Sequence, residues 1–507
     1  MNGAIHRRDF LKLAGFLPLS LAAPRWVSGL SAPSTQQNVI VVVFDAFSAF
    51  DISLYGYQRD TTPNLRRLAK RAIVYHNHYA GSNFTTSGTA SLLTGTLPWT
   101  HRALRPKDPV ARPFVTQNLF STFDDYFRLA YTHNGWANIL LEQFESVMNE
   151  HVPWKSLFLG SYDAFVESLF QRDEDIASVS WTRNLNLHED GYAYSLFFSH
   201  LYEILQAGSY KDLKRMFPRG LPSTGDVGAY FILERAIDWL GRRLMHVPQP
   251  FLGYFHLLPP HGPYNTELDF YNHFRGDSLK PPDKPADVFT EDVSDETLLR
   301  RRTEYDEFIL YVDREFGRFY DSLEQAGLLQ NTWLVFTSDH GEMFERGISA
   351  HSTNALYQPV IRIPLLVFEP GRQVGADVYT PTSAADILPT LAQVTGHPVP
   401  AWTEGTVLPP YASGAPDPNR HIYVVRAARN LEDQPLTTAS TMLLRDRYKL
   451  LYFFGYPERG VQEMVKLYDL KTDPDELVDL SSTRKDVAAS LLAELKARLN
   501  EVNKPYL

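Results

Sequence analysis

Two apolar, β-branched segments of the chain end in side chains that can bind a metal ion. Residues 38–44 lead directly into Asp45, and residues 332–337 are followed one position later by Asp339 and His340. Such runs are typical of strands that are buried on both faces of a parallel sheet. Ligands of these sheets bind beyond the carboxyl ends of the strands. Because an Asp after a strand is also a common turn residue, each segment alone is weak evidence for a metal site.

A third segment, residues 84–95, places small hydroxyl side chains before a short helical pattern. Thr85 is expected near the N-terminus of this helix, where free backbone N–H groups and the helix dipole favour an anion. A Thr at that point can be a simple helix cap. It can also be a nucleophile if a bound metal ion lowers the pKa of its hydroxyl. The residues alone leave both interpretations open.

These segments belong to a broad resemblance to the sulfatase family of the alkaline phosphatase superfamily. The similar segments follow the family's order over nearly the whole chain: residues 39–45, 55–57, 61–65, 90–95, 305–313, 337–342, 361–365, 386–391, 448–450 and 467–474. The resemblance implies an alkaline-phosphatase-like α/β fold and an enzyme that hydrolyses ester bonds.

The metal-binding and nucleophile positions of the family are only partly matched. Asp45 matches the first metal-binding Asp, but Ala46 stands where true sulfatases often have a second one. Asp339 matches a further metal ligand, and His340 stands where many sulfatases have Asn. Thr85 falls at the nucleophile position, where sulfatases convert a Cys or Ser to formylglycine. The resemblance therefore implies a Thr-nucleophile variant, similar to phosphodiesterases and phosphonate monoester hydrolases.

The metal set implied by this resemblance is Asp45, Thr85, Asp339 and His340. A mixture of oxygen and imidazole ligands suits Zn²⁺ or Mn²⁺ better than Ca²⁺, which prefers an all-oxygen shell. The cofactor expected is therefore a divalent metal ion, with Zn²⁺ or Mn²⁺ favoured.

Two further histidines match positions that contact the substrate in relatives. His261 lies in the segment Pro-His-Gly-Pro-Tyr just past the strand-like residues 251–258, and His351 follows the Asp-His-Gly segment by about a dozen residues. Loop residues often carry function, although either His could simply bond to the backbone. We expect His261 to be catalytic and substrate-binding, and His351 to bind the substrate.

The arrangement of segments predicts two folded parts. Strand-like runs at 38–44, 251–258, 332–337 and 363–368 alternate with helical patterns, which indicates an α/β domain with a mostly parallel sheet over residues 36–400. Helices are expected from Thr62, from Asp226 toward residue 244, and over 295–328. Proline-rich loops, short strands at 422–426, 438–444 and 448–453, and a helix at 486–499 predict a small C-terminal α+β subdomain over 401–507.

The first 34 residues predict a signal peptide and linker. Arg7 and Arg8 precede Phe10, Leu11 and Lys12, and an apolar stretch follows, as in a twin-arginine signal. That stretch is shorter than the roughly 20 residues that span a bilayer. We expect export through the twin-arginine machinery to the periplasm or the extracellular space, with no transmembrane anchor.

The composition limits the partners and the chemistry. The formal net charge is −10, which argues against nucleic acid as a partner and leaves a small anionic ester as the expected substrate. The chain has no Cys, so disulfides and thiolate sites are excluded. Four functions stay open: a phosphate mono- or diester hydrolase, a sulfuric ester hydrolase of the arylsulfatase type, a phosphoryl or headgroup transferase, and a non-catalytic binding homologue.

Overall fold

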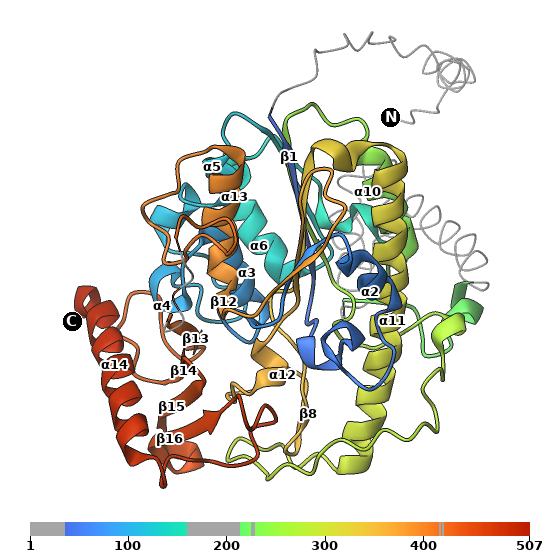
Figure 1. Ribbon diagram of the computed structural model, residues 1–507. Helices are drawn as coiled ribbons and strands as arrows, with labels where there is room; N and C mark the ends of the chain where they lie inside the picture. The colour runs from blue at the N-terminus through green and yellow to red at the C-terminus, as the bar shows by residue number, and fades with distance from the viewer. Residues whose placement is uncertain (1–35, 160–212, 225–228, 415–416, 418–419) are drawn as a thin grey trace, which may run out of the picture. The chain divides into compact units, whose positions relative to one another are not determined.

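A computed structural model describes residues 36–159, 213–224, 229–414, 417 and 420–507. The predicted signal peptide, residues 1–34, lies outside the described residues. Over the described residues the main feature is an eight-stranded sheet in the order β11-β2-β10-β7-β1-β6-β4-β5. Its strands are β1 Asn38–Phe44, β2 Ile73–Tyr75, β4 Phe127–Thr132, β5 Glu150–His151, β6 Phe251–Leu257, β7 Thr332–Thr337, β10 Leu365–Phe368 and β11 Ala376–Val378. Its central strand β1 is labelled in Figure 1.

Most of this sheet is parallel. The five strands β5, β4, β6, β1 and β7 run in the same direction, whereas β10 is antiparallel to both of its neighbours, β7 and β2. The predicted α/β class with a mostly parallel sheet is therefore confirmed. The carboxyl ends of β7, β1, β6 and β4 lie side by side, because neighbouring parallel strands end at the same edge.

Helices cover both faces of the sheet, which explains why β1 is apolar at every position after Asn38. Ile40, Val42 and Phe44 pack with α2 (Pro63–Ala69), α10 (Leu233–Leu244) and α11 (Asp295–Gln325). The alternate residues of β1 pack with helices on the other face, α3 (Thr85–Thr94), α6 (Gly135–Gln143) and α13 (Ile387–Thr395). Figure 1 shows these two groups on opposite sides of the sheet. The short helices are α4 Pro98–His101, α5 Leu119–Thr122 and α12 Gln358–Ile361.

Helix α2 begins at Pro63, directly after Thr62 as predicted, whereas the predicted start of α10 near Asp226 was wrong. The Thr62 side chain makes no capping bond to α2; instead the Asp313 carboxylate of α11 accepts from the N–H groups of Asn64 at 2.7 Å and Leu65 at 2.8 Å. Helix α10 begins at Leu233 rather than near Asp226, because Tyr230 and Phe231 form β-bridges before it. Pattern alone does not reveal a cap that comes from a distant helix.

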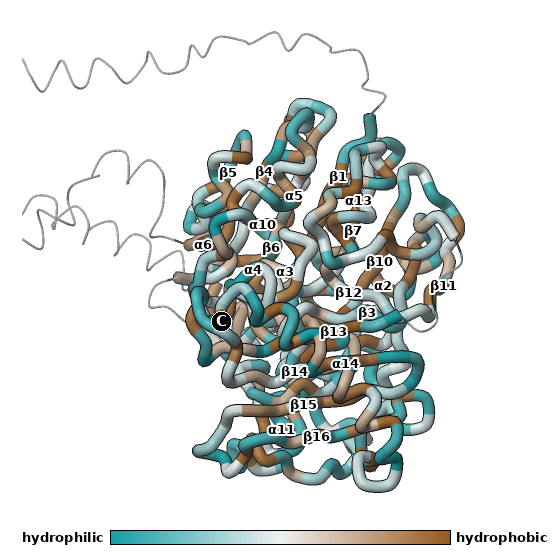
Figure 2. The backbone as a smooth tube through the Cα atoms, turned by 90° about the vertical axis from the view of Figure 1, so that its left-hand side faces the viewer, coloured by the Kyte–Doolittle hydropathy of each residue, from teal (hydrophilic) through white to brown (hydrophobic). Residues whose placement is uncertain are grey.

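The C-terminal subdomain is a four-stranded antiparallel sheet with one long helix. The strands β13 Ile422–Arg426, β14 Ala439–Arg445, β15 Tyr448–Tyr456 and β16 Val461–Asp469 follow one another in chain order, and α14 spans Lys485–Asn503. Figure 2 shows this sheet beside the short strands β3 (His78–Tyr79) and β12 (Thr382–Ser383) of the larger domain. The Val425 N–H donates to the carbonyl of Gly81 at 3.0 Å, which joins the two parts.

The remaining secondary structure is local. A two-stranded hairpin, β8 Phe344–Glu345 and β9 Ile348–Ser349, follows β7, and short 3-10 turns connect the larger elements. None of the helices in the described part of the chain combines the length and the apolar character needed to cross a membrane.

Candidate active site

Four adjacent parallel strands deliver polar side chains to one edge of the sheet. Asp45 follows β1, and Asp339 and His340 follow β7. His261 lies in the loop after β6, and Asn134 lies just after β4. The topology therefore explains how residues nearly 300 positions apart come to share one site.

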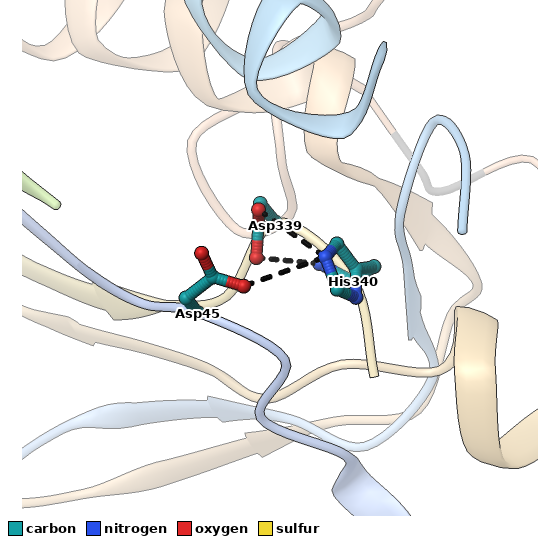
Figure 3. A group of neighbouring side chains, drawn as sticks. All are labelled: Asp45, Asp339 and His340. Atoms are coloured by element: carbon teal, nitrogen blue, oxygen red, sulfur yellow. Dashed lines mark hydrogen bonds and ion pairs between the residues drawn. The ribbon is translucent and has the colours of Figure 1, made fainter. Parts of the chain in front are cut away.

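Three of the predicted metal ligands form a buried cluster (Figure 3). The His340 Nε2 atom lies 3.4 Å from Asp45 Oδ1 and 3.5 Å from Asp339 Oδ2. All three side chains are fully buried. Ligand atoms about 2.1 Å from a shared ion lie roughly 3.4 Å apart in a tetrahedron, so these separations fit a Zn²⁺-sized site.

The hydrogen bonds of the cluster leave one face free for an ion. Asp339 Oδ1 accepts from the backbone N–H groups of Ala46 at 3.2 Å and His340 at 3.0 Å, whereas Asp339 Oδ2 and Asp45 Oδ1 have no hydrogen-bond partner among the described residues. His340 Nδ1 lies 2.9 Å from the Gly341 carbonyl, so it carries the proton and Nε2 keeps its lone pair. Unpaired buried carboxylate oxygens are costly without a cation, and this donor set fits a divalent transition metal.

Thr85 lies at the edge of this cluster. It is the first residue of α3, and Phe84 before it occupies the cap position. The Thr85 hydroxyl lies 3.3 Å from His340 Nε2 and accepts from the Asn134 amide at 3.4 Å. The hydroxyl is therefore directed at the cluster. It makes no hydrogen bond within the described residues that would cap α3.

Helix α3 can approach the cluster closely because Gly88 faces Asp339. A Cβ atom added at Gly88 would lie 2.3 Å from the Asp339 carbonyl oxygen, a distance that real Cβ atoms do not reach. Because position 88 has no side chain, α3 can pack against the end of β7. This close packing brings Thr85, one turn earlier in the helix, near Asp339.

The other two predicted site residues lie next to the cluster. The ring centroids of His340 and His351 are 4.3 Å apart, and those of His261 and His351 are 4.9 Å apart. His351 Nδ1 lies 3.1 Å from the Glu342 carboxylate, and His261 Nδ1 lies 2.7 Å from the Gly262 carbonyl. Each of these histidines has one nitrogen held by a neighbour, which fixes the orientation of its ring.

Burial and neighbouring charges shift the pKa values around the cluster. Burial alone would raise the pKa of Asp45, but His261, His256 and His340 together hold it below its ordinary value. Burial raises the pKa of Glu342 to about 7, against the opposing effect of His261 and His340. Burial also lowers the pKa of His351 to about 3, with a further contribution from the charge of His261. Asp45 is therefore an anion at neutral pH, as a metal ligand must be.

Two further residues at this edge are not among the site residues predicted from the sequence. Asn134 caps α6 through its side-chain oxygen, and its amide group donates to Asp45 and Thr85. His256, within β6, points its Nε2 atom at Asp45 Oδ2, 3.4 Å away. This histidine nitrogen has no hydrogen-bond partner in the described part of the chain. Recognising β4 as a strand would have placed Asn134 at the shared edge.

The family of the chain follows from a comparison with known proteins. The family model described as Sulfatase matches residues 37–397, and the model described as N-sulphoglucosamine sulphohydrolase, C-terminal, matches residues 350–505. The chain is 25% identical to choline-sulfatase of Rhizobium meliloti over 440 residues, 83% of this chain and 77% of that protein. It is 25% identical to arylsulfatase K of Bos taurus over 297 residues, 53% of this chain and 54% of that protein.

Solved structures share the fold at lower identity. The phosphonate monoester hydrolase of Agrobacterium radiobacter superposes with a TM-score of 0.66 at 20% identity, over 93% of this chain and 96% of that chain. A 2-O GAG sulfatase superposes with a TM-score of 0.64 at 16% identity, over 93% of both chains. Because the Sulfatase model matches more than half of the chain, the chain belongs to the sulfatase family of ester-hydrolysing enzymes.

Proposed function

We propose that the chain is an exported, metal-dependent hydrolase that cleaves phosphate or sulfate esters with Thr85 as its nucleophile. The observation that carries this proposal is the position of the Thr85 hydroxyl, 3.3 Å from His340 Nε2 at the edge of the Asp45–Asp339–His340 cluster. This hydroxyl belongs to the first residue of a helix, where the N-terminus favours an anion, and it lies beside the proposed metal ligands.

A bound divalent ion, Zn²⁺ or Mn²⁺ by the donor set, would lower the pKa of the Thr85 hydroxyl and stabilise negative charge on the ester. The Thr85 oxygen then attacks phosphorus or sulfur, and the bond to the departing alcohol breaks. Water cleaves the resulting Thr85 ester and restores the hydroxyl, which releases phosphate from a monoester, a phosphate monoester from a diester, or sulfate from a sulfate ester. Asn134 holds both Thr85 and Asp45 in place through its amide group.

The two histidines beside the cluster are suited to the substrate anion and the leaving group. Burial lowers the pKa of His261, but the carboxylates of Asp45 and Glu342 raise it above the ordinary value overall. His261 would bind the ester oxygens and donate a proton to the departing oxygen. His351, held by Glu342, would act as a neutral donor or acceptor to the same group.

The two ester classes both have support among similar proteins. Choline-sulfatase and arylsulfatase K are named for sulfate esters, and phosphonate monoester hydrolase is named for a phosphorus ester. A Thr nucleophile, without the formylglycine of sulfatases, favours phosphorus over sulfur. Export rests on the Arg7–Arg8 pair and the apolar stretch that follows it.

An ester screen tests this function. The purified chain, loaded with Zn²⁺ or Mn²⁺, is assayed on 4-nitrophenyl phosphate, bis(4-nitrophenyl) phosphate and 4-nitrophenyl sulfate. We expect nitrophenol release that a chelator abolishes and added metal restores. Absence of turnover on all three by metal-loaded protein would favour the binding-homologue alternative. Transfer of the phosphoryl group to an added alcohol faster than to water would favour a transferase.

A further inference from the structure

An arginine of the C-terminal subdomain reaches the edge of the proposed active site. Arg426 is the last residue of β13, and the preceding residue, Val425, is hydrogen-bonded to Gly81. The strand therefore runs beside the segment that leads from Gly81 to Thr85. This contact brings a side chain from the second half of the chain next to the proposed nucleophile.

Three neighbours fix the guanidinium group of Arg426. Its Nε donates to Asn354 Oδ1 at 3.1 Å, and its Nη1 donates to Asn83 Oδ1 at 3.3 Å. The Cζ atom lies 5.2 Å from the centre of the Phe84 ring, a distance at which a cation is attracted to the ring. All three neighbours are uncharged, and they lie in the two loops that carry Thr85 and His351.

The positive charge of Arg426 has no carboxylate partner among the described residues. Its two hydrogen bonds to amide oxygens use two of the five N–H groups of a guanidinium. Burial lowers the pKa of Arg426 to about 10, so the group is still charged at neutral pH, and its side chain is only partly exposed. Arg429, three residues later, instead pairs with Glu458 at 2.5 Å.

Asn83 connects Arg426 to the loop that carries His351. The Asn83 amide donates to the carbonyl of His351 at 3.0 Å and to that of Thr353 at 2.8 Å, while its oxygen accepts from Arg426. Within the described residues, Arg426 makes no hydrogen bond or ion pair with Asp45, Asp339 or His340. The Arg426 guanidinium therefore contacts the loops that carry Thr85 and His351 rather than the cluster itself.

We propose that Arg426 binds a second anionic group of the substrate, a carboxylate, sulfate or phosphate separate from the ester that is cleaved. A planar guanidinium whose remaining N–H groups are free, as here in the described part of the chain, forms paired hydrogen bonds with such anions. This inference rests on the proposed function, because it specifies the substrate class of the same site. It implies selectivity for esters that carry at least two negative groups.

Binding to a variant that cannot form the Thr85 ester tests the inference without hydrolysis. Zn²⁺-loaded Thr85→Ala protein is titrated by calorimetry with phenyl sulfate and phenyl phosphate, and with the 2-, 3- and 4-carboxyphenyl forms of each. The same titrations are made in Thr85→Ala protein that also carries Arg426→Gln, Arg426→Lys or, as the matched control, Arg429→Gln. Melting temperatures establish that each variant is folded.

At least one carboxyphenyl isomer should bind about tenfold or more tightly than its parent ester, the usual gain from a charged hydrogen bond. Arg426→Gln should remove this gain in affinity and change the affinity for the parent ester by no more than about twofold. Arg426→Lys should keep part of the gain, and Arg429→Gln should keep all of it. The inference would be overturned if Thr85→Ala protein with Arg426 intact bound the parent and carboxyphenyl esters with equal affinity. It would also be overturned if Arg426→Gln weakened the binding of parent and carboxyphenyl esters equally.

The two proposals fail separately. Turnover of the phenyl esters by the unmodified chain, with no affinity gain from a carboxylate, would reject the role of Arg426 and leave the proposed hydrolysis standing. A gain that Arg426→Gln removes, in a chain that hydrolyses none of the esters, would reject the nucleophilic role of Thr85 and leave Arg426 as an anion-binding residue.

Discussion

Among the described residues, no arginine or lysine forms an ion pair with either carboxylate of the cluster. Asp45 and Asp339 are both fully buried, and the side chains of His256 and His340 lie within ion-pair distance of them. Removing two such charges from water is expensive unless a cation or several donors compensate them. A divalent ion between Asp45, Asp339 and His340 would supply this compensation and give both unpaired oxygens a partner.

The first prediction follows from the two distinct oxygens of Asp339. Asp339→Asn can keep Oδ1 for the two backbone N–H groups, but it places an NH₂ group where Oδ2 faces the ion. We expect the metal content of the purified protein to fall by about tenfold or more, measured by elemental analysis after dialysis. The exposed Asp269→Asn is the control and should keep full metal content. Unchanged metal content in Asp339→Asn would contradict the assigned ligand set.

At the scale of secondary structure, the site depends on how closely α3 packs against the end of β7. The Cβ of Gly88→Ala would lie 2.3 Å from the backbone oxygen of Asp339, which cannot rotate away. We expect Gly88→Ala to lose about 1–3 kcal/mol of unfolding free energy, measured by urea denaturation, and to bind metal more weakly because Thr85 and Asp339 separate.

A second helical glycine provides the control for this change. A Cβ at Gly241 of α10 would lie 3.2 Å from Ser322 Oγ, the end of a side chain that can rotate. Gly241→Ala should be neutral or stabilise the protein by up to about 1 kcal/mol through helix propensity. Equal stability of Gly88→Ala and the parent protein would show that α3 does not need this close approach.

Burial accounts for several of the strands that the sequence predicted or missed. Strands β1 and β7 were predicted with their observed bounds, because they are apolar on both faces. Strand β4 was missed because its first two residues are only partly buried, and β16 because five of its nine residues are not buried. Helix α2 was predicted correctly, although its cap comes from α11 rather than from Thr62.

The same distinction applies to the site. Asp45, Asp339, His340 and Thr85 stand at the ends of recognisable elements, so their meeting could be expected from the rule that parallel strands end at a common edge. Asn134 follows the unrecognised β4. Residues 83 and 426, which share a hydrogen bond, are 343 positions apart, and only the packing of the C-terminal subdomain against the larger sheet brings them together.

At the scale of the whole molecule, several histidines are buried in their neutral form. Burial lowers the pKa of both His78 and His101 to about 3, far below their ordinary value. The unfolded chain therefore binds more protons than the folded chain between about pH 6.5 and pH 3, so stability falls as the pH falls through this range. Each such histidine lowers the free energy of unfolding by about 2 kcal/mol when the pH falls from 7 to 5.

This pH dependence can be assigned with one substitution. His101→Asn can keep an acceptor for the Ala103 N–H while removing the titrating ring. We expect urea denaturation at pH 7 and pH 5 to show a smaller loss of stability for His101→Asn than for the parent, by about 2 kcal/mol. The exposed His246→Asn should behave like the parent. An identical loss for His101→Asn and the parent would show that His101 does not titrate in this way.

The proposed export concerns the whole chain and gives a prediction of its own. Arg7→Lys together with Arg8→Lys should abolish export and leave the protein folded in the cytoplasm, because the paired arginines are what the twin-arginine machinery recognises. Cell fractionation followed by immunoblotting measures the distribution. Unchanged export of the double variant would reject the twin-arginine route.

The central claim, that Thr85 is the nucleophile, is tested most directly by the turnover of metal-loaded Thr85→Ala. Thr85 makes no capping bond in α3, so this variant should melt close to the parent protein and keep most of its metal. Its turnover on the best ester of the screen should fall by about 10³-fold or more, while Thr85→Ser, which keeps a hydroxyl, should retain part of the activity. A stable, metal-loaded Thr85→Ala protein that turns over at the parent rate would contradict the covalent mechanism.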